Sequence, residues 1–303
     1  MLVFLKFILT RSIVFYLVCT GLVWQFLDYQ KLVRNAIPQT MSRLTPPIDY
    51  FAEFVDKDSR YDPYKLMNCI NYHQAVTQFF DFQKAEGFGM LGFCYDRLGN
   101  RHLAKDSYQK AISFNPDYFW PYYDLGVINY NEKQYAGAVD YFEKAIGLNP
   151  LKTVLLLSRS KVYNDVRLSK VGGTYDFIEG IKEGRKEAYI LLMNSLYKNG
   201  SYPELWAISV DGIRQGLDTQ GVFYYYAGLA AFNQKSYEKA VEFMQIALQN
   251  DPHNSDALLY LGMCLKIAGQ EQMAQVLLEK AALLHKQEGS FIDNYLKARV
   301  RFF

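Results

Sequence analysis

Residues 86–116 read EGFGMLGFCYDRLGNRHLAKDSYQKAISFNP, and residues 120–150 read WPYYDLGVINYNEKQYAGAVDYFEKAIGLNP. The second stretch repeats the small residues, the aromatic rings and the closing proline of the first, 34 positions later. A fixed period of this size predicts a repeat protein whose units stack on their neighbours. The same places recur later in the chain as Gly92, Gly126, Gly228 and Gly262, as Ala104, Ala138, Ala240 and Ala274, and as Ala111, Ala145, Ala247 and Ala281.

Prolines follow the same period, since Pro116, Pro150 and Pro252 each close a unit. The residue before a proline avoids the helical conformation, so these prolines are expected to end helices. Glycine and alanine are expected where paired helices cross closely. Ala138 and Ala240 lie 102 residues apart, which is three periods of 34. We therefore expect the register to continue unbroken through the middle of the chain, where the motif weakens.

The residues at these places resemble the tetratricopeptide-repeat family. They are Phe88, Leu91, Gly92 and Tyr95 for the first helix of the unit, and Ala104, Tyr108, Ala111 and Pro116 for its second helix and terminator. The resemblance implies an all-α fold, a right-handed α-solenoid of helix–turn–helix units. It also implies that the first helices line a concave face, and that this face binds partner proteins.

The period predicts six units over residues 85–288, of which the two central ones are degenerate. Gly184 stands at a proline place there, and Trp206 stands where a small residue belongs. The central units are either divergent repeats with a wider helix angle, or a segment that loosens at 166–184 and bends the array. The other expected parts are strong units at 221–252 and 255–285, degenerate units at 153–186 and 187–220 (together 153–220), and capping helices at 61–84 and 289–303.

The N-terminus predicts a transmembrane helix. Residues 2–27 are apolar except for a few polar side chains, and only Lys6 and Arg11 carry charge. This length suffices to cross a bilayer, with Arg11 reaching back to the interface. We expect an uncleaved signal anchor over 1–29 and a linker over 30–60. A cleaved signal peptide is the alternative, although no small-residue cleavage motif follows the apolar run; a buried core helix is the third possibility.

The orientation of this anchor depends on few charges. Lys6 and Arg11 precede the uncharged part of the run, whereas Lys31, Arg34 and Arg43 follow it, so the positive-inside rule decides little. A short basic N-terminus ahead of a single apolar segment more often stays in the cytoplasm. We therefore expect a single-pass membrane protein with an extracytoplasmic repeat domain.

The family resemblance implies a set of residues that face the groove. We expect two aromatic ladders among them, one with Trp120, Tyr123 and Tyr130, and one with Tyr225, Leu229 and Phe232. The alternative for each ring is packing against neighbouring helices. Some family members hold a terminal carboxylate with Lys and Asn, but Gly89, Phe93 and Asp124 stand at the matching places, so that clamp is not expected. The predicted groove residues are Phe93, Trp120, Tyr123, Val127, Tyr130, Leu157, Lys161, Leu191, Tyr225, Leu229 and Phe232.

Composition and motifs give no indication of chemistry. The formal net charge is +2 with no basic stripe, so nucleic acid is not an expected partner. No metal site, cofactor site or catalytic motif is predicted, and the chain is not expected to be an enzyme. Cys69, Cys94 and Cys264 are expected to be small buried apolar residues, although a disulfide between Cys69 and Cys94 stays open. The histidines, His73, His102, His253 and His285, are spread over different units.

A membrane-anchored scaffold is the function that these features predict. Its concave groove would hold a helix or an extended segment of a partner protein, within a membrane-associated complex. One alternative is a polysaccharide-binding or export-associated repeat protein, in which the aromatic ladder stacks on sugar rings. Another is a structural subunit of an envelope assembly.

Overall fold

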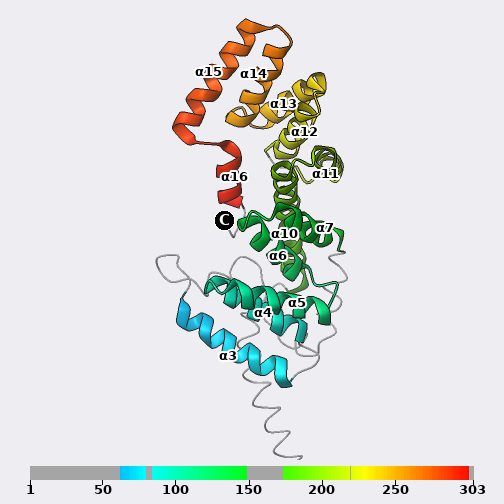
Figure 1. The fold of residues 1–303 in the computed structure, drawn as a ribbon, viewed down its shortest axis with the longest axis vertical. Helices are drawn as coiled ribbons and strands as arrows, with labels where there is room; N and C mark the ends of the chain where they lie inside the picture. The colour runs from blue at the N-terminus through cyan, green and yellow to red at the C-terminus, as the bar shows by residue number, and fades with distance from the viewer. Residues whose placement is uncertain (1–61, 80–83, 149–172, 219, 300–303) are drawn as a thin grey trace, which may run out of the picture. The chain divides into compact units, whose positions relative to one another are not determined.

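The computed structural model describes residues 62–79, 84–148, 173–218 and 220–299. Every regular element in these ranges is a helix, as the sequence predicts. The chain divides into two compact units, 1–60 with 154–179 and 61–153 with 180–303, and the described helices belong to the second unit except for residues 173–179. The helices are α3 (Pro63–Phe79), α4 (Lys84–Arg97), α5 (Arg101–Phe114), α6 (Phe119–Asn131), α7 (Tyr135–Gly147), α10 (Gly173–Asn199), α11 (Tyr202–Arg214), α12 (Val222–Asn233), α13 (Tyr237–Asn250), α14 (Ser255–Ile267), α15 (Glu271–Glu288) and α16 (Phe291–Arg299) (Figure 1).

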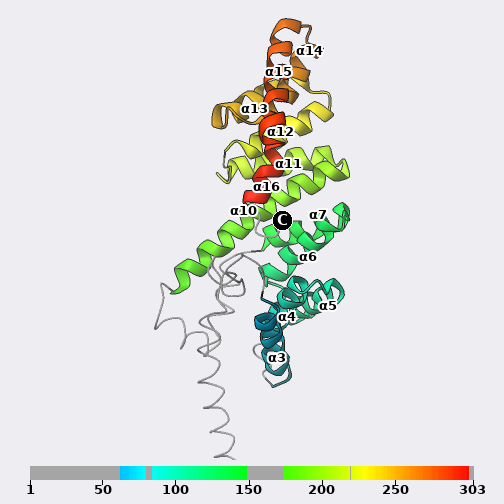
Figure 2. The ribbon, with the colours of Figure 1, turned by 90° about the vertical axis from the view of Figure 1, so that its left-hand side faces the viewer.

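Successive helices pair through short turns that contain one residue in the left-handed conformation. Helix α4 packs on α5, α6 on α7, α12 on α13 and α14 on α15, and two perpendicular views show these pairs (Figures 1 and 2). In the first pair Gly99 has a φ of 79°, and the amide of Asn100 donates to the carbonyl of Tyr95 over 2.8 Å. This bond closes the end of α4. Gly269 has a φ of 76° at the same place after α14. The predicted helix–turn–helix units are present.

The glycines of the repeat leave room for a large side chain from the paired helix. A β-carbon on Gly126 would lie 2.6 Å from Cε1 of Phe142, whose side chain is fully buried. Side chains cannot approach so closely, so the ring of Phe142 requires glycine at this place. The prediction that small residues mark a close crossing of paired helices is confirmed. The other pairs of this kind are Gly92 with Tyr108, Gly228 with Met244, and Gly262 with Leu278.

The central part of the chain differs from the sequence prediction, because α10 is one continuous helix of 27 residues. It runs through the boundary predicted between 153–186 and 187–220. Gly184 stands there instead of proline, and glycine keeps the backbone N–H that proline lacks, so the helix continues. Within the segment predicted to loosen, residues 173–184 are helical and residues 166–172 lie outside the described ranges.

Helix α11 begins one residue earlier than the period predicts. The amide of Leu205 donates to the carbonyl of Ser201, which is the bond that Ala104 makes with Asn100 in the first unit. Leu205 therefore occupies the small-residue place and is fully buried, whereas Trp206 is only partly buried. The expectation of an unbroken register is wrong in this unit. The longer connection between α11 and α12 restores the register.

Helix α10 packs directly on the α6–α7 pair. The Nε of Arg185 donates to the carbonyl of Ile146 in α7 over 3.0 Å. The ring of Trp120 in α6 lies against Gly184, where a β-carbon would be 2.8 Å from Cη2 of the indole. The repeat predicted at 187–220 thus packs directly on the repeat that ends with α7. Residues 153–172, the first part of the intervening predicted unit, lie outside the described ranges.

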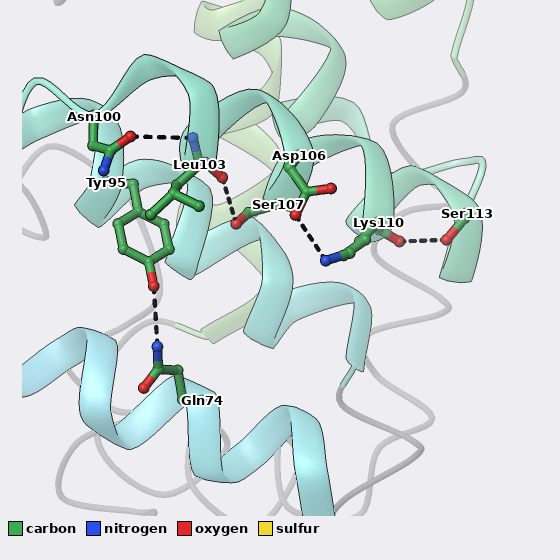
Figure 3. Close-up of polar contacts among 8 residues, drawn as sticks. All are labelled: Gln74, Tyr95, Asn100, Leu103, Asp106, Ser107, Lys110 and Ser113. Atoms are coloured by element: carbon green, nitrogen blue, oxygen red, sulfur yellow. Dashed lines mark hydrogen bonds and ion pairs between the residues drawn. The ribbon is translucent and has the colours of Figure 1, made fainter.

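Helices α3 and α16 flank the paired helices in sequence. Helix α3 packs on α4, where the side-chain amide of Gln74 donates to the hydroxyl of Tyr95 over 3.0 Å (Figure 3). Helix α16 is attached to the start of α14, because the hydroxyl of Ser290 and the amide of Ile292 both donate to the carboxylate of Asp256 over 2.9 Å. Helices are therefore present in both predicted capping segments, and the remaining domain boundaries stay predictions.

The predicted membrane anchor and linker, residues 1–29 and 30–60, lie outside the described ranges. Among the helices that the structure does describe, none combines the length and the apolar character needed to cross a membrane. The anchor therefore stays a prediction.

Candidate functional site

The first helices of the units, α4, α6, α10, α12 and α14, carry the side chains that the sequence assigns to a concave face. Side-chain hydrogen bonds join some of these helices through residues that are far apart in the sequence. The amide of Asn194 in α10 donates to the hydroxyl of Tyr130 in α6 over 2.8 Å. The hydroxyls of Tyr197 in α10 and Tyr260 in α14 lie 3.1 Å apart. The first helices therefore form one connected face, which is called the first-helix face below.

Most of the residues predicted to line the groove are buried. Tyr123 is fully buried, its hydroxyl donates to the carboxylate of Glu187 over 2.9 Å, and its ring centroid lies 5.8 Å from that of Trp120. These contacts match the alternative that the sequence left open, packing between neighbouring helices. The buried residues are Phe93, Tyr123, Val127, Leu191, Tyr225 and Leu229; the partly buried ones are Trp120, Tyr130 and Phe232; Leu157 and Lys161 lie outside the described ranges.

The two predicted aromatic ladders are arranged differently from expectation. Tyr130 meets the ring of Tyr135 at 5.6 Å, within its own helix pair. Phe232 meets Tyr260 at 5.2 Å, and Tyr260 also meets Tyr225 at 6.4 Å. Tyr260 thus connects α12 to α14, a role that the sequence analysis missed. Its place one period after Tyr226 is the signal that could have identified it.

A polar pocket of about 320 Å³ lies where α4 and α6 end, and residues Asp96, Arg97, Gly99, Arg101, Val127 and Asn131 line it. Of the predicted groove residues only Val127 takes part. The guanidinium of Arg97 lies 3.1 Å from the carboxylate of Asp96 and 5.5 Å from the ring centroid of Phe93. Arg101 and Asn131 are exposed. Arg97 and Asn131 are one period apart, a regularity that could have pointed to this pocket.

A buried carboxyl group stands beside this pocket. Asp124 in α6 is only slightly accessible, and burial raises its pKa to about 7, although the charge of Arg97 opposes the shift. The hydroxyl of Tyr108 forms a hydrogen bond to Asp124, which favours the charged form. At neutral pH the Asp124 carboxyl is therefore divided between its neutral and charged forms. The pocket carries two guanidinium groups and the single carboxylate of Asp96, so it favours an acidic group.

Helix α16 lies along the first-helix face. Its residues Ile292, Tyr295 and Leu296 are buried, and α16 contacts α14. The charge of Asp293 contributes to the raised pKa of Tyr130 in α6 and of Tyr226 in α12, so α16 passes close to both helices. Both views show α16 running from the end of α15 back beside α12 and α10 (Figures 1 and 2). This face therefore accepts an amphipathic helix.

Helix α16 covers only part of the last helix pair, α14 and α15. The last helix pair exposes Leu259, Met263 and Ile267 on α14 and Met273 and Val276 on α15. In earlier units the places of Leu259 and Met263 belong to the buried Tyr123 and Val127. Helix α16 thus leaves this end of the last pair in contact with solvent. Among the described residues, no group of three His, Cys, Asp or Glu side chains is placed to hold a metal ion.

Comparison with known proteins identifies tetratricopeptide repeats within this chain. A family model described as tetratricopeptide repeat matches residues 85–118 and 121–150, and a second model of that description matches 221–255. Human tetratricopeptide repeat protein 6 is 33% identical over 76 residues, which cover 25% of this chain and 15% of the human protein. Human protein O-mannosyl-transferase TMTC1 is 24% identical over 222 residues, which cover 68% of this chain and 24% of the human protein. The chain thus spans a quarter or less of these relatives.

A solved structure shows a similar fold. The crystal structure of YrrB, described as a tetratricopeptide-repeat protein with an unusual peptide-binding site, has a TM-score of 0.50 at 15% identity. The likeness covers 74% of this chain and 96% of the YrrB chain. At this identity it concerns the fold alone.

Proposed function

Because the chain is a tetratricopeptide-repeat protein, we propose that it is a membrane-anchored scaffold that holds a segment of a partner protein against its first-helix face. Repeat proteins of this fold mediate protein–protein interactions, and no reaction is proposed for this chain. The mannosyl-transferase activity in the name of the human relative belongs to that protein, of which this chain covers 24%.

The position of α16 is the observation that carries this proposal. An amphipathic helix already lies on the first-helix face, with Ile292, Tyr295 and Leu296 buried. A face that packs against one such helix is suited to a second amphipathic helix beside it. The segment that binds is therefore proposed to be helical, with apolar residues at helical spacing.

The polar pocket supplies specificity in this proposal. Arg101 is exposed at the start of α5 and Asn131 at the end of α6, and both line the pocket together with Arg97. An acidic side chain of the partner would accept hydrogen bonds from these groups, and bonds to a charged acceptor are stronger than neutral ones. The burial of Tyr123 and Tyr225 supports a protein partner over a sugar, because their ring faces are not accessible for stacking.

The predicted anchor over residues 1–29 would hold the repeats beside a membrane, with the repeats outside the cytoplasm. Anchoring raises the local concentration of the binding face, so a weak groove can still recruit its partner. This part of the proposal rests on the apolar sequence of residues 2–27 alone.

Site-specific crosslinking in the native membrane tests the proposal. A photoreactive residue in place of Asn131 should capture a partner protein that can be identified by mass spectrometry. The same residue in place of Glu143, exposed on the second helix α7, is the matched control and should capture little. Equal capture at both positions would contradict the assignment of the first-helix face. Protease accessibility of the repeats in intact cells tests the orientation.

A further inference from the structure

Buried polar side chains cluster between α3 and α4, outside the pocket described above. The Sγ atoms of Cys69 in α3 and Cys94 in α4 are 2.9 Å apart, and both residues are buried free thiols. His73 follows Cys69 by one turn and is 2% exposed. The imidazole of His73 lies beside Cys69, whose pKa it lowers through a hydrogen bond and through its charge, and the hydroxyl of Tyr72 has no hydrogen-bond partner among the described residues. Buried polar groups are nearly always paired, and exceptions point to a redox or catalytic role or to a bound group.

The distance between the sulfurs lies between the values expected for two possible roles. Two thiolates on a tetrahedral zinc ion, each at about 2.3 Å from the metal, would be ~3.8 Å apart. A disulfide needs a separation of about 2.05 Å, so the two Sγ atoms would have to approach by only ~0.9 Å. Contact of two buried apolar residues would leave the buried imidazole of His73 beside Cys69 unexplained. A metal site would also need at least a third ligand, and among the described residues no group of three His, Cys, Asp or Glu side chains is placed to hold an ion, so the pair fits a disulfide better.

We propose that Cys69 and Cys94 are a redox-active pair that forms a disulfide between α3 and α4, with Cys69 as the attacking thiol and His73 as the residue that positions and deprotonates it. The bond would close the chain from Cys69 to Cys94 and fasten α3 to the first helix pair. Helix α3 is the described helix nearest in sequence to the predicted membrane anchor.

The roles of the two cysteines follow from their surroundings. Cys69 is 9% exposed and Cys94 is fully buried, so a small oxidant reaches Cys69 first. The hydrogen bond from the Cys94 thiol lowers the pKa of Cys69 to about 6, and the charge of His73 acts in the same direction against the effect of burial. The same hydrogen bond, together with burial, raises the pKa of Cys94. Cys69 is therefore the thiolate at neutral pH, and thiolates are the attacking species in disulfide exchange.

The oxidant that fits this site is a low-molecular-weight disulfide. The Cys69 thiolate attacks one sulfur of the small disulfide, the bond between its two sulfurs breaks, and one small thiolate leaves. The Cys94 sulfur then attacks the Cys69 sulfur of the mixed disulfide and displaces the second small thiolate. The two protons that the Cys69 and Cys94 thiols give up pass to the two small thiolates. The protein pair is oxidised by two electrons, and the small disulfide is reduced to two thiols.

Peptide mapping of the full chain tests this proposal. The protein is reduced, incubated with oxidised glutathione, treated with an alkylating reagent and digested with trypsin. Cleavage after Lys65, Lys84 and Arg97 places Cys69 and Cys94 on separate peptides, so the disulfide gives one crosslinked species that is two hydrogens lighter than their sum. We expect this species in the wild type and in Cys264→Ser, and its loss in Cys69→Ser and in Cys94→Ser.

The pH dependence separates an activated thiol from a passive one. The rate of crosslinking in the wild type should rise with pH and level off above about 6, where the Cys69 thiolate predominates. In His73→Asn the rate at pH 7 should fall and the profile should shift toward the higher pH of an ordinary thiol. Formation of glutathione adducts on Cys69 without the crosslinked peptide would overturn the proposal, as would full alkylation of both thiols after oxidation. An unchanged profile in His73→Asn would overturn the role of His73.

Discussion

Replacing Gly126 by alanine is expected to destabilise the repeat stack through one defined contact. The new β-carbon would lie 2.6 Å from Cε1 and 2.7 Å from Cδ1 of Phe142. Carbon atoms prefer separations of about 3.5–4.0 Å, so the ring would have to move by ~1 Å. Phe142 is fully buried and its ring meets Tyr123 at 6.2 Å, so there is little space into which it can move.

The size of the effect follows from two opposing contributions. Extra atoms in a packed core cost about 1–3 kcal/mol. Alanine in a helix interior is more favourable than glycine by about 1 kcal/mol. Gly147 is the matched control, because it lies in α7 and has no atom within 4 Å of a β-carbon placed on it. Gly147 is the last residue of α7, where the preference for alanine is weaker than in a helix interior, so Gly126→Ala should be less stable than Gly147→Ala by up to about 3 kcal/mol.

Urea unfolding followed by circular dichroism measures this difference. The double variant Gly126→Ala with Phe142→Leu completes the experiment, because a smaller side chain at 142 should remove most of the additional cost of alanine at 126. Equal stabilities of Gly126→Ala and Gly147→Ala would refute the reasoning, since they would show that the close approach of Phe142 does not require glycine.

Three further predictions concern other parts of the second compact unit, residues 61–153 with 180–303. Asp124 has a folded-state pKa of about 7, above its value of about 3.9 in an unfolded chain, so its contribution to stability is complete below pH ~4 and is lost as the pH rises through 7; urea unfolding should show a fall in stability between about pH 4 and 7 that Asp124→Asn lacks. Leu205→Ala should cost about 2–5 kcal/mol in urea unfolding, because Leu205 is fully buried, and a loss smaller than that of Trp206→Ala would argue against the one-residue shift. Asp256→Ala removes the acceptor of the Ser290 and Ile292 bonds, so hydrogen exchange in α16 should accelerate while exchange in α13 stays unchanged.

Much of the repeat could be predicted from local sequence, because each unit repeats the same short-range requirements. Gly126 must be small since Phe142 follows it by 16 residues in the paired helix. Gly99 adopts a left-handed conformation that the turn needs. Such constraints are satisfied within one helix pair, so the period alone identifies them.

The binding face could be predicted only in part. Tyr123 and Leu191 have the residue types and the spacing of groove residues, yet both are buried between helices. Whether a ring on a first helix is accessible depends on which helix packs beside it, and for α6 that helix is α10. The polar pocket at Arg97 and Asn131 lies at the ends of α4 and α6, and the family resemblance assigns no groove residue to either position.

The sequence by itself determined the helix pairs, their turns and the small residues at their crossings, because these depend on side chains within 34 residues of one another. It also determined the apolar N-terminal run on which the anchor is proposed. Only the tertiary structure decided that α10 runs through a predicted boundary and packs on α6 and α7, and that α16 turns back along the first-helix face. Those choices depend in part on contacts between residues farther apart than one repeat, such as Tyr130 with Asn194, which are 64 positions apart, and no local pattern records such contacts.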